Sequence, residues 1–135
     1  PGYRSRHNSS YWNGEKYIGI GPSAHSFNGS QRSWNKANNM LYIKSLNENI
    51  IPFEKEILSP TEKLDEYVMT SLRTMEGMDL KIIEKTFSIT ERNRIEKLLK
   101  TKIKKENFIQ KNNHIILTDE GKLFADRISV ELFSE

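Results

Sequence analysis

The chain contains no cysteine among its 135 residues. Without thiolates, these residues cannot ligate an iron–sulfur cluster or build a Cys-type zinc site. Long apolar runs are also missing, so no segment is predicted to span a membrane. A starting methionine and a signal-like apolar segment are absent as well. We therefore expect a piece of a longer protein, and the lack of cysteine agrees with a cytoplasmic location.

Charged residues are abundant but unevenly distributed. The net charge is +3, and hydrophobic residues make up 36% of the chain. Residues 1–58 carry seven Lys and Arg against four Glu, whereas residues 59–135 carry fourteen basic and fourteen acidic residues. The hydrophobic content is enough for one modest core, and the excess positive charge belongs to the front half.

Residues 1–58 lack the elements of a complete fold. KYIGIG at 16–21 predicts a strand, and its glycines, Gly19 and Gly21, indicate close approach of another group to the backbone. Apolar residues at helical spacing predict a helix over 36–47. They are Met40, Ile43 and Leu46. Since one strand and one helix have no partners of their own, we interpret this half as the tail of a larger α/β domain whose body lies upstream.

Residues 59–135 contain the elements of a self-contained unit. SPTE places Ser59 as the N-cap of a first helix, with Pro60 at its first position and Glu62 closing a capping box. Gly77 is expected to end this helix, and Thr90 is expected to cap a third one. The predicted inward residues of the first three helices are Leu64, Tyr67, Val68, Leu72, Met75, Leu80, Ile83, Phe87, Ile95, Leu98, Leu99 and Ile103.

A hairpin and a last helix complete this second half. NFIQKNNHIIL predicts two short strands around a polar turn. Thr118 then caps a helix whose first turn carries Asp119 and Glu120, on the favourable end of the helix dipole. Its predicted buried residues are Leu123, Phe124, Ile128 and Leu132. Three helices, a hairpin and a helix form a winged-helix arrangement, and we place its start at residue 59.

The stretch RHNSSYW at 6–12 is the most unusual part of the sequence. It suits neither a turn nor an alternating strand, because two large aromatics and a histidine flank two serines. Its residue types fit heme: an imidazole can ligate the iron, an amide can orient that imidazole, aromatic rings can stack on the porphyrin, and arginines can bind propionates. In that order, the candidates are His7, Asn8, Tyr11, Trp12, Arg4 and Arg6. A histidine that is merely structural is the open alternative.

Five motifs in order resemble one protein family over nearly the whole chain. They are SRHNSSYW, YIGIGPSAHSF, RSWN, LRTMEGMDL and LTDEGKLFAD. The family is that of the radical-SAM coproporphyrinogen oxidases, and its HemW-type branch of heme chaperones is the most similar. One departure is Ser23, where the family usually has a second glycine.

The resemblance implies a fold and cofactors beyond this chain. Residues 1–58 would close a radical-SAM α/β barrel, and residues 59–135 would form the HemN-type C-terminal domain, so the expected fold class is α+β. The full-length protein would hold a 4Fe-4S cluster and S-adenosylmethionine, with the cluster ligands upstream of this chain. The expected partners are heme, heme-accepting proteins and the upstream barrel, with peripheral association with the membrane.

The same resemblance implies heme delivery, with alternatives left open. The HNxxYW signature of the HemW branch is matched by His7, Asn8, Tyr11 and Trp12. The alternative is an oxygen-independent coproporphyrinogen III oxidase, which decarboxylates two propionate side chains oxidatively. This chain supplies no cluster ligand or evident radical-generating group, so we expect it not to be catalytic by itself.

Other residues are weaker candidates. Gly19, Gly21 and His25 lie in a strand and loop where S-adenosylmethionine or a tetrapyrrole could approach the backbone, or where the chain simply packs tightly. Arg32 and Asn35 match an RxxN pattern and are expected to bond within the barrel. His114 is predicted at an exposed turn and receives no role. We therefore rank these residues below the RHNSSYW stretch as candidate binding sites.

A winged helix also permits nucleic-acid binding. The third helix, residues 91–105, would be the recognition helix. The basic residues of this predicted helix are Arg92, Arg94, Lys97, Lys100, Lys102, Lys104 and Lys105. Against nucleic-acid binding, residues 59–135 carry no net charge, so long-range attraction to phosphate is weak. We consider nucleic acid an improbable partner.

Overall fold

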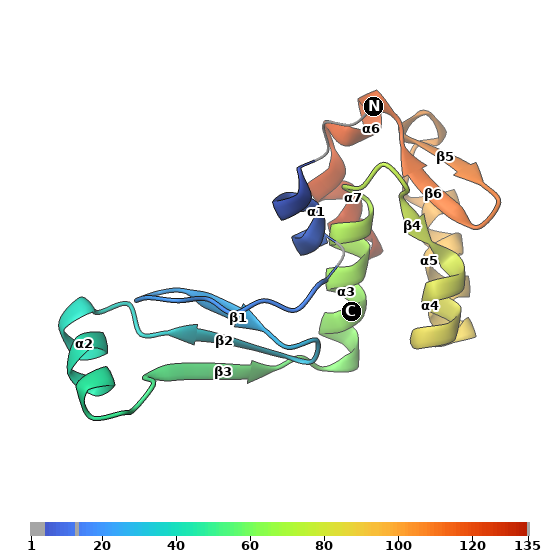
Figure 1. The fold of residues 1–135 in the computed structure, drawn as a ribbon. Coiled ribbons are helices and arrows are strands. Elements are labelled where there is room, and N and C mark those ends of the chain that lie inside the picture. Colours follow the sequence, from blue (N-terminus) through green and yellow to red (C-terminus); the bar gives the residue numbers. More distant parts are fainter. Residues whose placement is uncertain (1–4, 13, 135) are drawn as a thin grey trace. The chain divides into compact units, whose positions relative to one another are not determined.

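The structure is a computed structural model that describes residues 5–12 and 14–134. The chain divides into two units, and each is described by itself. One unit consists of residues 14–58, and the other combines residues 1–13 with residues 59–135. Both contain helices and strands, so the α+β class is confirmed (Figure 1). None of the helices in the described residues has the length and apolar character needed to cross a membrane.

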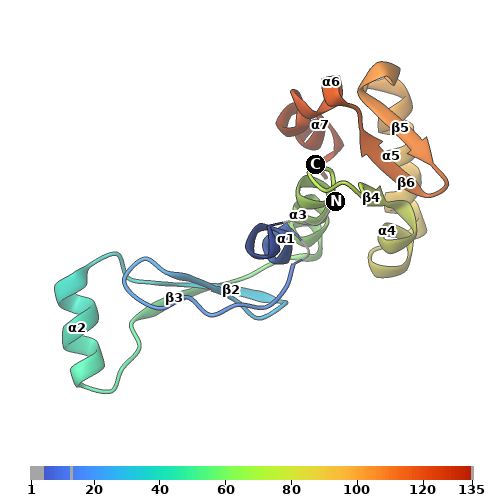
Figure 2. The same ribbon diagram turned by 45° about the horizontal axis from the view of Figure 1, so that its top comes forward.

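The unit of residues 14–58 is an antiparallel sheet with one helix. Its strands β1 (His25–Phe27), β2 (Gln31–Asn35) and β3 (Phe53–Ile57) pair in the order β1-β2-β3. Helix α2 (Asn39–Asn47) connects β2 to β3 and is capped by the side chain of Asn38. This helix lies at one end of the sheet rather than over a face (Figures 1 and 2). The unit therefore leaves most of its apolar side chains uncovered.

The strand predicted over 16–21 is wrong within these residues. Only an isolated bridge between Tyr17 and Phe27 forms, and residues 18–20 have no regular structure. A strand needs a neighbour for its backbone groups, and no described strand lies beside Ile18 or Ile20. Both side chains are more than four-fifths exposed, at 86% and 89%.

The second unit is built on three helices whose limits follow from their caps. Helix α3 (Pro60–Ser71) starts at the predicted capping box, in which Ser59 and Glu62 bond each other's backbone. Helix α4 (Leu80–Thr86) is capped by Asp79. Helix α5 (Ile89–Thr101) is capped by Ser88 and not by Thr90, because the Ser88 hydroxyl accepts from the N–H of Glu91.

A three-stranded sheet and two short helices complete this unit. The hairpin is confirmed as β5 (Phe108–Lys111) and β6 (His114–Leu117), which follow a 3₁₀ turn, η1 (Lys105–Asn107). A strand that the sequence did not reveal, β4 (Met78–Asp79), pairs with β6, so the order is β4-β6-β5. The expected last helix is two helices. They are α6 (Asp119–Lys122) and α7 (Ala125–Leu132).

The core of the second unit contains most of the predicted residues. Buried side chains from α3, α4, α5, α7 and the sheet form one cluster. Three predictions were wrong because helices end or turn earlier than expected: Met75 lies beyond the end of α3, and Leu123 and Phe124 lie at the break between α6 and α7. These side chains are 76%, 81% and 50% exposed, respectively. The core consists of Leu64, Val68, Leu72, Met78, Leu80, Ile83, Ile95, Leu99, Ile103, Ile115, Leu117, Ile128 and Leu132.

Candidate functional site

The stretch RHNSSYW forms a helix, α1 (Arg6–Trp12). Residues four apart in a helix lie on the same face, so the spacing of this motif pairs His7 with Tyr11. Their rings meet edge to face, with centroids 4.9 Å apart and an interplanar angle of 81°. Both side chains are exposed. The sequence interpretation missed the helix, although the two i,i+4 pairs in HNxxYW are a signal for it.

The second pair of the motif, Asn8 and Trp12, lies on the adjoining face of α1. Trp12 is 40% exposed, and the guanidinium carbon of Arg73 lies 5.7 Å from the centroid of its ring. That is cation–π distance. Both views show α1 beside α3, in the unit that contains Arg73 (Figures 1 and 2). The motif is thus in contact with the part of its own unit that residues 59–135 form.

The arrangement on α1 fits an axial heme ligand. Among the described residues, the imidazole of His7 contacts Tyr11 and makes no hydrogen bond, so its ring nitrogens are accessible. A porphyrin supplies four iron ligands itself, so one imidazole can complete an axial position. The described residues contain no group of three or more His, Cys, Asp or Glu side chains that could hold a metal ion. A single exposed imidazole is thus chemically able to ligate the iron of a porphyrin.

The other predicted heme-binding residues are the two arginines and Asn8. Arg6 is exposed at the start of α1, where a propionate could reach it. Arg4 lies outside the described residues. Asn8 makes no hydrogen bond to His7, since adjacent positions of a helix point apart. Its backbone N–H instead donates to the hydroxyl of Ser5, at 3.3 Å.

The predicted glycine and histidine site lies in the other unit, around the start of β1. A Cβ added to Gly19 would stand 2.1 Å from the carbonyl oxygen of His25. Gly21 has a φ of +106°, and its carbonyl accepts a hydrogen bond of 2.9 Å from the buried side chain of Asn35. The contact at Gly19 favours the tight-packing alternative there. A Cβ at Gly21 would meet nothing within 4 Å, so that glycine is explained by its positive φ. The ring of His25 is exposed and lies 6.1 Å from that of Trp34.

Ser23 adopts the left-handed conformation that the family's glycine would adopt freely. Its φ is +61°, a region that non-glycine residues enter at a cost. The departure from the family pattern is therefore accommodated by strain at one residue.

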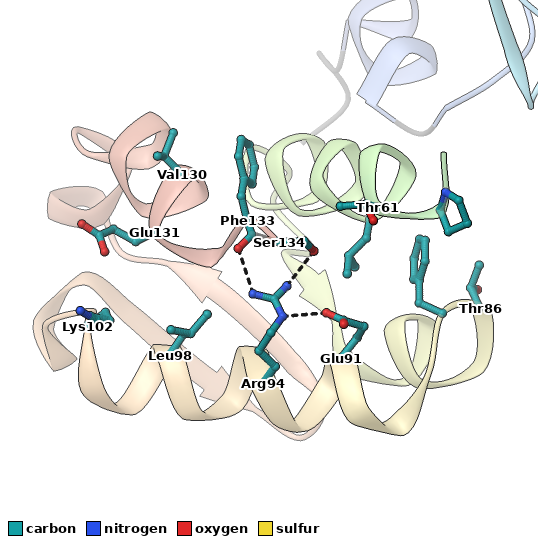
Figure 3. A pocket seen from close by; sticks show the side chains of 13 residues that line it. Thr61, Thr86, Glu91, Arg94, Leu98, Lys102, Val130, Glu131, Phe133 and Ser134 are labelled. Carbon is teal, nitrogen blue, oxygen red and sulfur yellow. Dashed lines mark hydrogen bonds and ion pairs between the residues drawn. The ribbon is translucent and has the colours of Figure 1, made fainter. Parts of the chain in front are cut away.

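A hollow in the second unit has a structural explanation. It lies between α3, α5 and α7 and has a volume of about 1280 Å³ (Figure 3). Arg94 projects into it and donates hydrogen bonds to the carbonyl oxygens of Leu132 and Phe133, at 3.1 and 2.9 Å, and to the Ser134 hydroxyl. A carboxylate oxygen of Glu91 lies 2.7 Å from the Nε of Arg94. Arg94 thus satisfies carbonyls at the end of α7 that have no partner within the helix.

The basic residues of α5 are partly occupied by internal contacts. Besides Arg94, the side chain of Arg92 pairs with Glu84 and with Glu96, and these hydrogen bonds raise its pKa. Two of the seven basic residues proposed for nucleic-acid contact therefore hold the unit together. This weakens the recognition-helix interpretation.

His114 has a structural role that the sequence did not reveal. Its ring is not at a free turn: Nδ1 lies 3.0 Å from the Glu76 carbonyl oxygen, and Nε2 lies 3.8 Å from a carboxylate oxygen of Asp79. The hydroxyl of Tyr67 accepts from the Asp79 N–H and donates to its carbonyl, at 3.0 and 3.2 Å. Burial raises the pKa of Tyr67. Together these side chains tie α3 and β6 to β4.

Comparison with known proteins identifies relatives of both units. Residues 58–124 match the HemN C-terminal domain family. The heme chaperone HemW of Bacillus subtilis is 26% identical over 128 residues, which are 94% of this chain and 34% of that protein. The heme chaperone HemW of Mycobacterium tuberculosis is 30% identical over 129 residues, or 95% and 31%. The chain spans about a third of the length of these relatives.

A solved structure has a similar fold. It is that of coproporphyrinogen III oxidase (HemN) from Escherichia coli, a radical SAM enzyme. The similarity has a TM-score of 0.69 at 21% identity and covers 89% of this chain and 29% of that one.

Proposed function

We propose that this chain is the C-terminal part of a HemW-type protein. That protein binds heme and delivers it to heme-requiring proteins. The proposal is supported by the match of residues 58–124 to the HemN C-terminal domain family and by the similarity of the chain to HemW heme chaperones. The observation that carries the heme part is the exposed His7 on α1, whose ring nitrogens make no hydrogen bond among the described residues. A cytoplasmic location and peripheral association with the membrane belong to the same proposal.

The residues of α1 would divide the work of holding heme. His7 would ligate the iron, and heme would supply the redox-active iron and the apolar plate that the acceptor protein needs. Tyr11 keeps the imidazole in an edge-to-face contact and offers apolar surface beside it. Arg6, with Arg4, would bind the propionates, while Trp12 presents a further ring on the adjoining face of the helix.

We also propose the place of each unit in a longer protein. Residues 1–58 would close a radical-SAM barrel, and residues 59–135 would be a winged-helix-like domain. The apolar side chains left uncovered by the small sheet support the first part, since apolar surface of this kind usually has a partner. In the full-length protein the barrel would carry the 4Fe-4S cluster and S-adenosylmethionine. Gly19, Gly21 and His25 would lie near that cofactor or a tetrapyrrole.

The uncovered set comes from the sheet, its helix and the connecting segments. It is composed of Ile18, Ile20, Met40, Leu41, Ile43, Leu46, Ile50, Ile51, Phe53 and Ile57. Several of these line a hollow of about 280 Å³ with the buried Asn35.

A heme titration of the complete protein, measured by Soret absorbance, tests the heme proposal. The three histidines provide a matched set: His7→Ala, His25→Ala and His114→Ala. We expect a saturable, shifted Soret band in the parent and in His114→Ala, which is the control, while His25→Ala tests the second candidate site. His7→Ala should weaken heme binding by at least about tenfold, because it removes the iron ligand.

Three other outcomes have defined meanings. Equal heme binding by the parent and His7→Ala would contradict the ligand assignment. Loss of the band in His25→Ala alone would move the site to the other unit. If the complete protein binds no heme but decarboxylates coproporphyrinogen III, the oxidase alternative replaces the chaperone.

A further inference from the structure

Helix α1 is too short to hold its own shape. It has seven residues and no buried side chain, and isolated helices below about 12 residues are marginal in water. Its first turn has no acidic residue and its last turn has no basic one, so it lacks charges that would favour its dipole. The orientation of His7 must therefore be set from outside the helix.

Arg73 supplies an external contact at the end where α1 stops. Its guanidinium carbon lies 5.7 Å from the ring centroid of Trp12, the last residue of α1. A cation at this position faces an aromatic ring. The contact thus gives α1 an interaction that its own residues do not supply.

Two further contacts fix the guanidinium of Arg73 itself. One terminal nitrogen donates to the carbonyl oxygen of Met69 near the end of α3, and the other donates to the carboxylate of Asp126 in the first turn of α7. The Arg73 side chain is 26% exposed. Since α3 and α7 both contribute to the core, Arg73 is held by the rigid part of its unit.

Fixing Trp12 also fixes the direction of His7. The pair Asn8 and Trp12 lies on one face of α1, and the pair His7 and Tyr11 lies on the adjoining face. A contact that holds the first face against Arg73 therefore turns the second face in a defined direction.

We propose that Arg73 is a positioning residue that holds α1 on the HemN-type C-terminal domain and thereby sets the direction of the His7 imidazole. The docking of α1 stands on geometry alone. The consequence for heme rests on the function proposed above. The arginine of the LRTMEG motif thus acts on the HNxxYW motif, although more than sixty residues separate them in sequence.

Hydrogen exchange of the complete protein, read for peptides covering residues 5–12, tests the docking without heme. Arg73→Met keeps an unbranched apolar stem, although a shorter one, and removes the charge. Loss of a cation–π contact changes an equilibrium constant about two- to fivefold. The amides of α1 should therefore exchange about threefold faster or more. Arg73→Lys should restore part of the protection. Arg94→Met is the matched control, since it removes an equally paired arginine of the same unit and should leave α1 unchanged.

The exchange of α3 amides shows whether Arg73→Met remains folded. If α3 also loses protection, Trp12→Leu decides instead, because Trp12 is exposed and its loss leaves the core intact. Unchanged α1 exchange in the folded variant would overturn the proposal.

Soret titration of the same variants tests the second half. Arg73→Met should weaken heme binding about threefold or more through loss of the same contact, and Arg73→Lys should recover part of it. Faster α1 exchange with unchanged heme binding would contradict the claim that Arg73 sets the direction of His7. The claim that Arg73 holds α1 on the domain would stand. If the parent binds no heme, the proposed function fails, while the exchange result still decides the docking.

Discussion

Gly121 illustrates how one side-chain position can control the packing of the second unit. It lies buried in α6, and a Cβ there would stand 1.9 Å from the carbonyl oxygen of Asn107. That carbonyl cannot easily move, because it accepts a hydrogen bond from the N–H of Thr118. The Thr118 hydroxyl in turn donates to the backbone carbonyl oxygen of Glu106. The glycine is therefore required by the close approach of η1 to α6.

Replacing Gly121 with alanine should destabilise the unit. Forcing a methyl group into this contact costs about 2 kcal/mol of unfolding free energy or more. Urea denaturation followed by circular dichroism measures the change. Glu120→Ala, on the exposed side of the same helix, is the control and should change stability by less than about 0.5 kcal/mol. Equal stability of Gly121→Ala and the parent would contradict the packing described here.

The capping box at α3 shows how an element's start controls its response to pH. The hydroxyl of Ser59 accepts from the Glu62 N–H at 3.2 Å, and the Glu62 carboxylate accepts from the Ser59 N–H at 2.7 Å. These hydrogen bonds hold the pKa of Glu62 below its usual 4.5. A lowered pKa in the folded state stabilises folding above the unfolded pKa, and this contribution disappears as pH falls through the folded pKa.

Ser59→Ala should therefore have a pH-dependent effect on stability. At pH 7 the loss of the hydroxyl cap should cost about 1 kcal/mol. At pH 3 the difference from the parent should be smaller, because protonation of Glu62 has already weakened the box in the parent. Thermal unfolding at both pH values measures this, with Thr61→Ala as a control that leaves the box intact. An identical difference at both pH values would show that Glu62 is not coupled to Ser59.

At the scale of the whole molecule, the two units differ in how much they bury. Within residues 14–58, the buried side chains are those of Asn35 and Leu58, whereas the second unit has an extended apolar core. Local opening is easiest where few apolar contacts form. The sheet of the first unit should therefore open far more readily in this chain.

Hydrogen exchange of the 135-residue chain should show this difference directly. Amides of β2 should exchange on the order of 100-fold faster than those of α3 and α5. If the complete protein has the upstream barrel proposed above and this barrel covers the apolar residues, the β2 amides should exchange more slowly there. Similar protection of β2 and α5 in the 135-residue chain would contradict the claim that the small sheet lacks a core of its own.

Local signals in the sequence determined much of the second unit. The capping residues and apolar spacing predicted α3, α4 and the hairpin, because each depends on contacts within a few residues. The five motifs also led to the family that residues 58–124 match. The HNxxYW spacing contained the information for α1, since His7 and Tyr11, and likewise Asn8 and Trp12, are four residues apart.

Only the tertiary structure decided the rest, because the deciding contacts join residues far apart in sequence. Strand β4 pairs with β6, which lies more than thirty residues later in the sequence. Because β4 has only two residues, its sequence is too short to show a strand pattern. The break between α6 and α7 exposes Leu123, which the helical spacing placed in the core. Trp12 meets Arg73 only because α1 lies beside α3. Likewise, the carbonyl of His25, and not the strand pattern, explains Gly19.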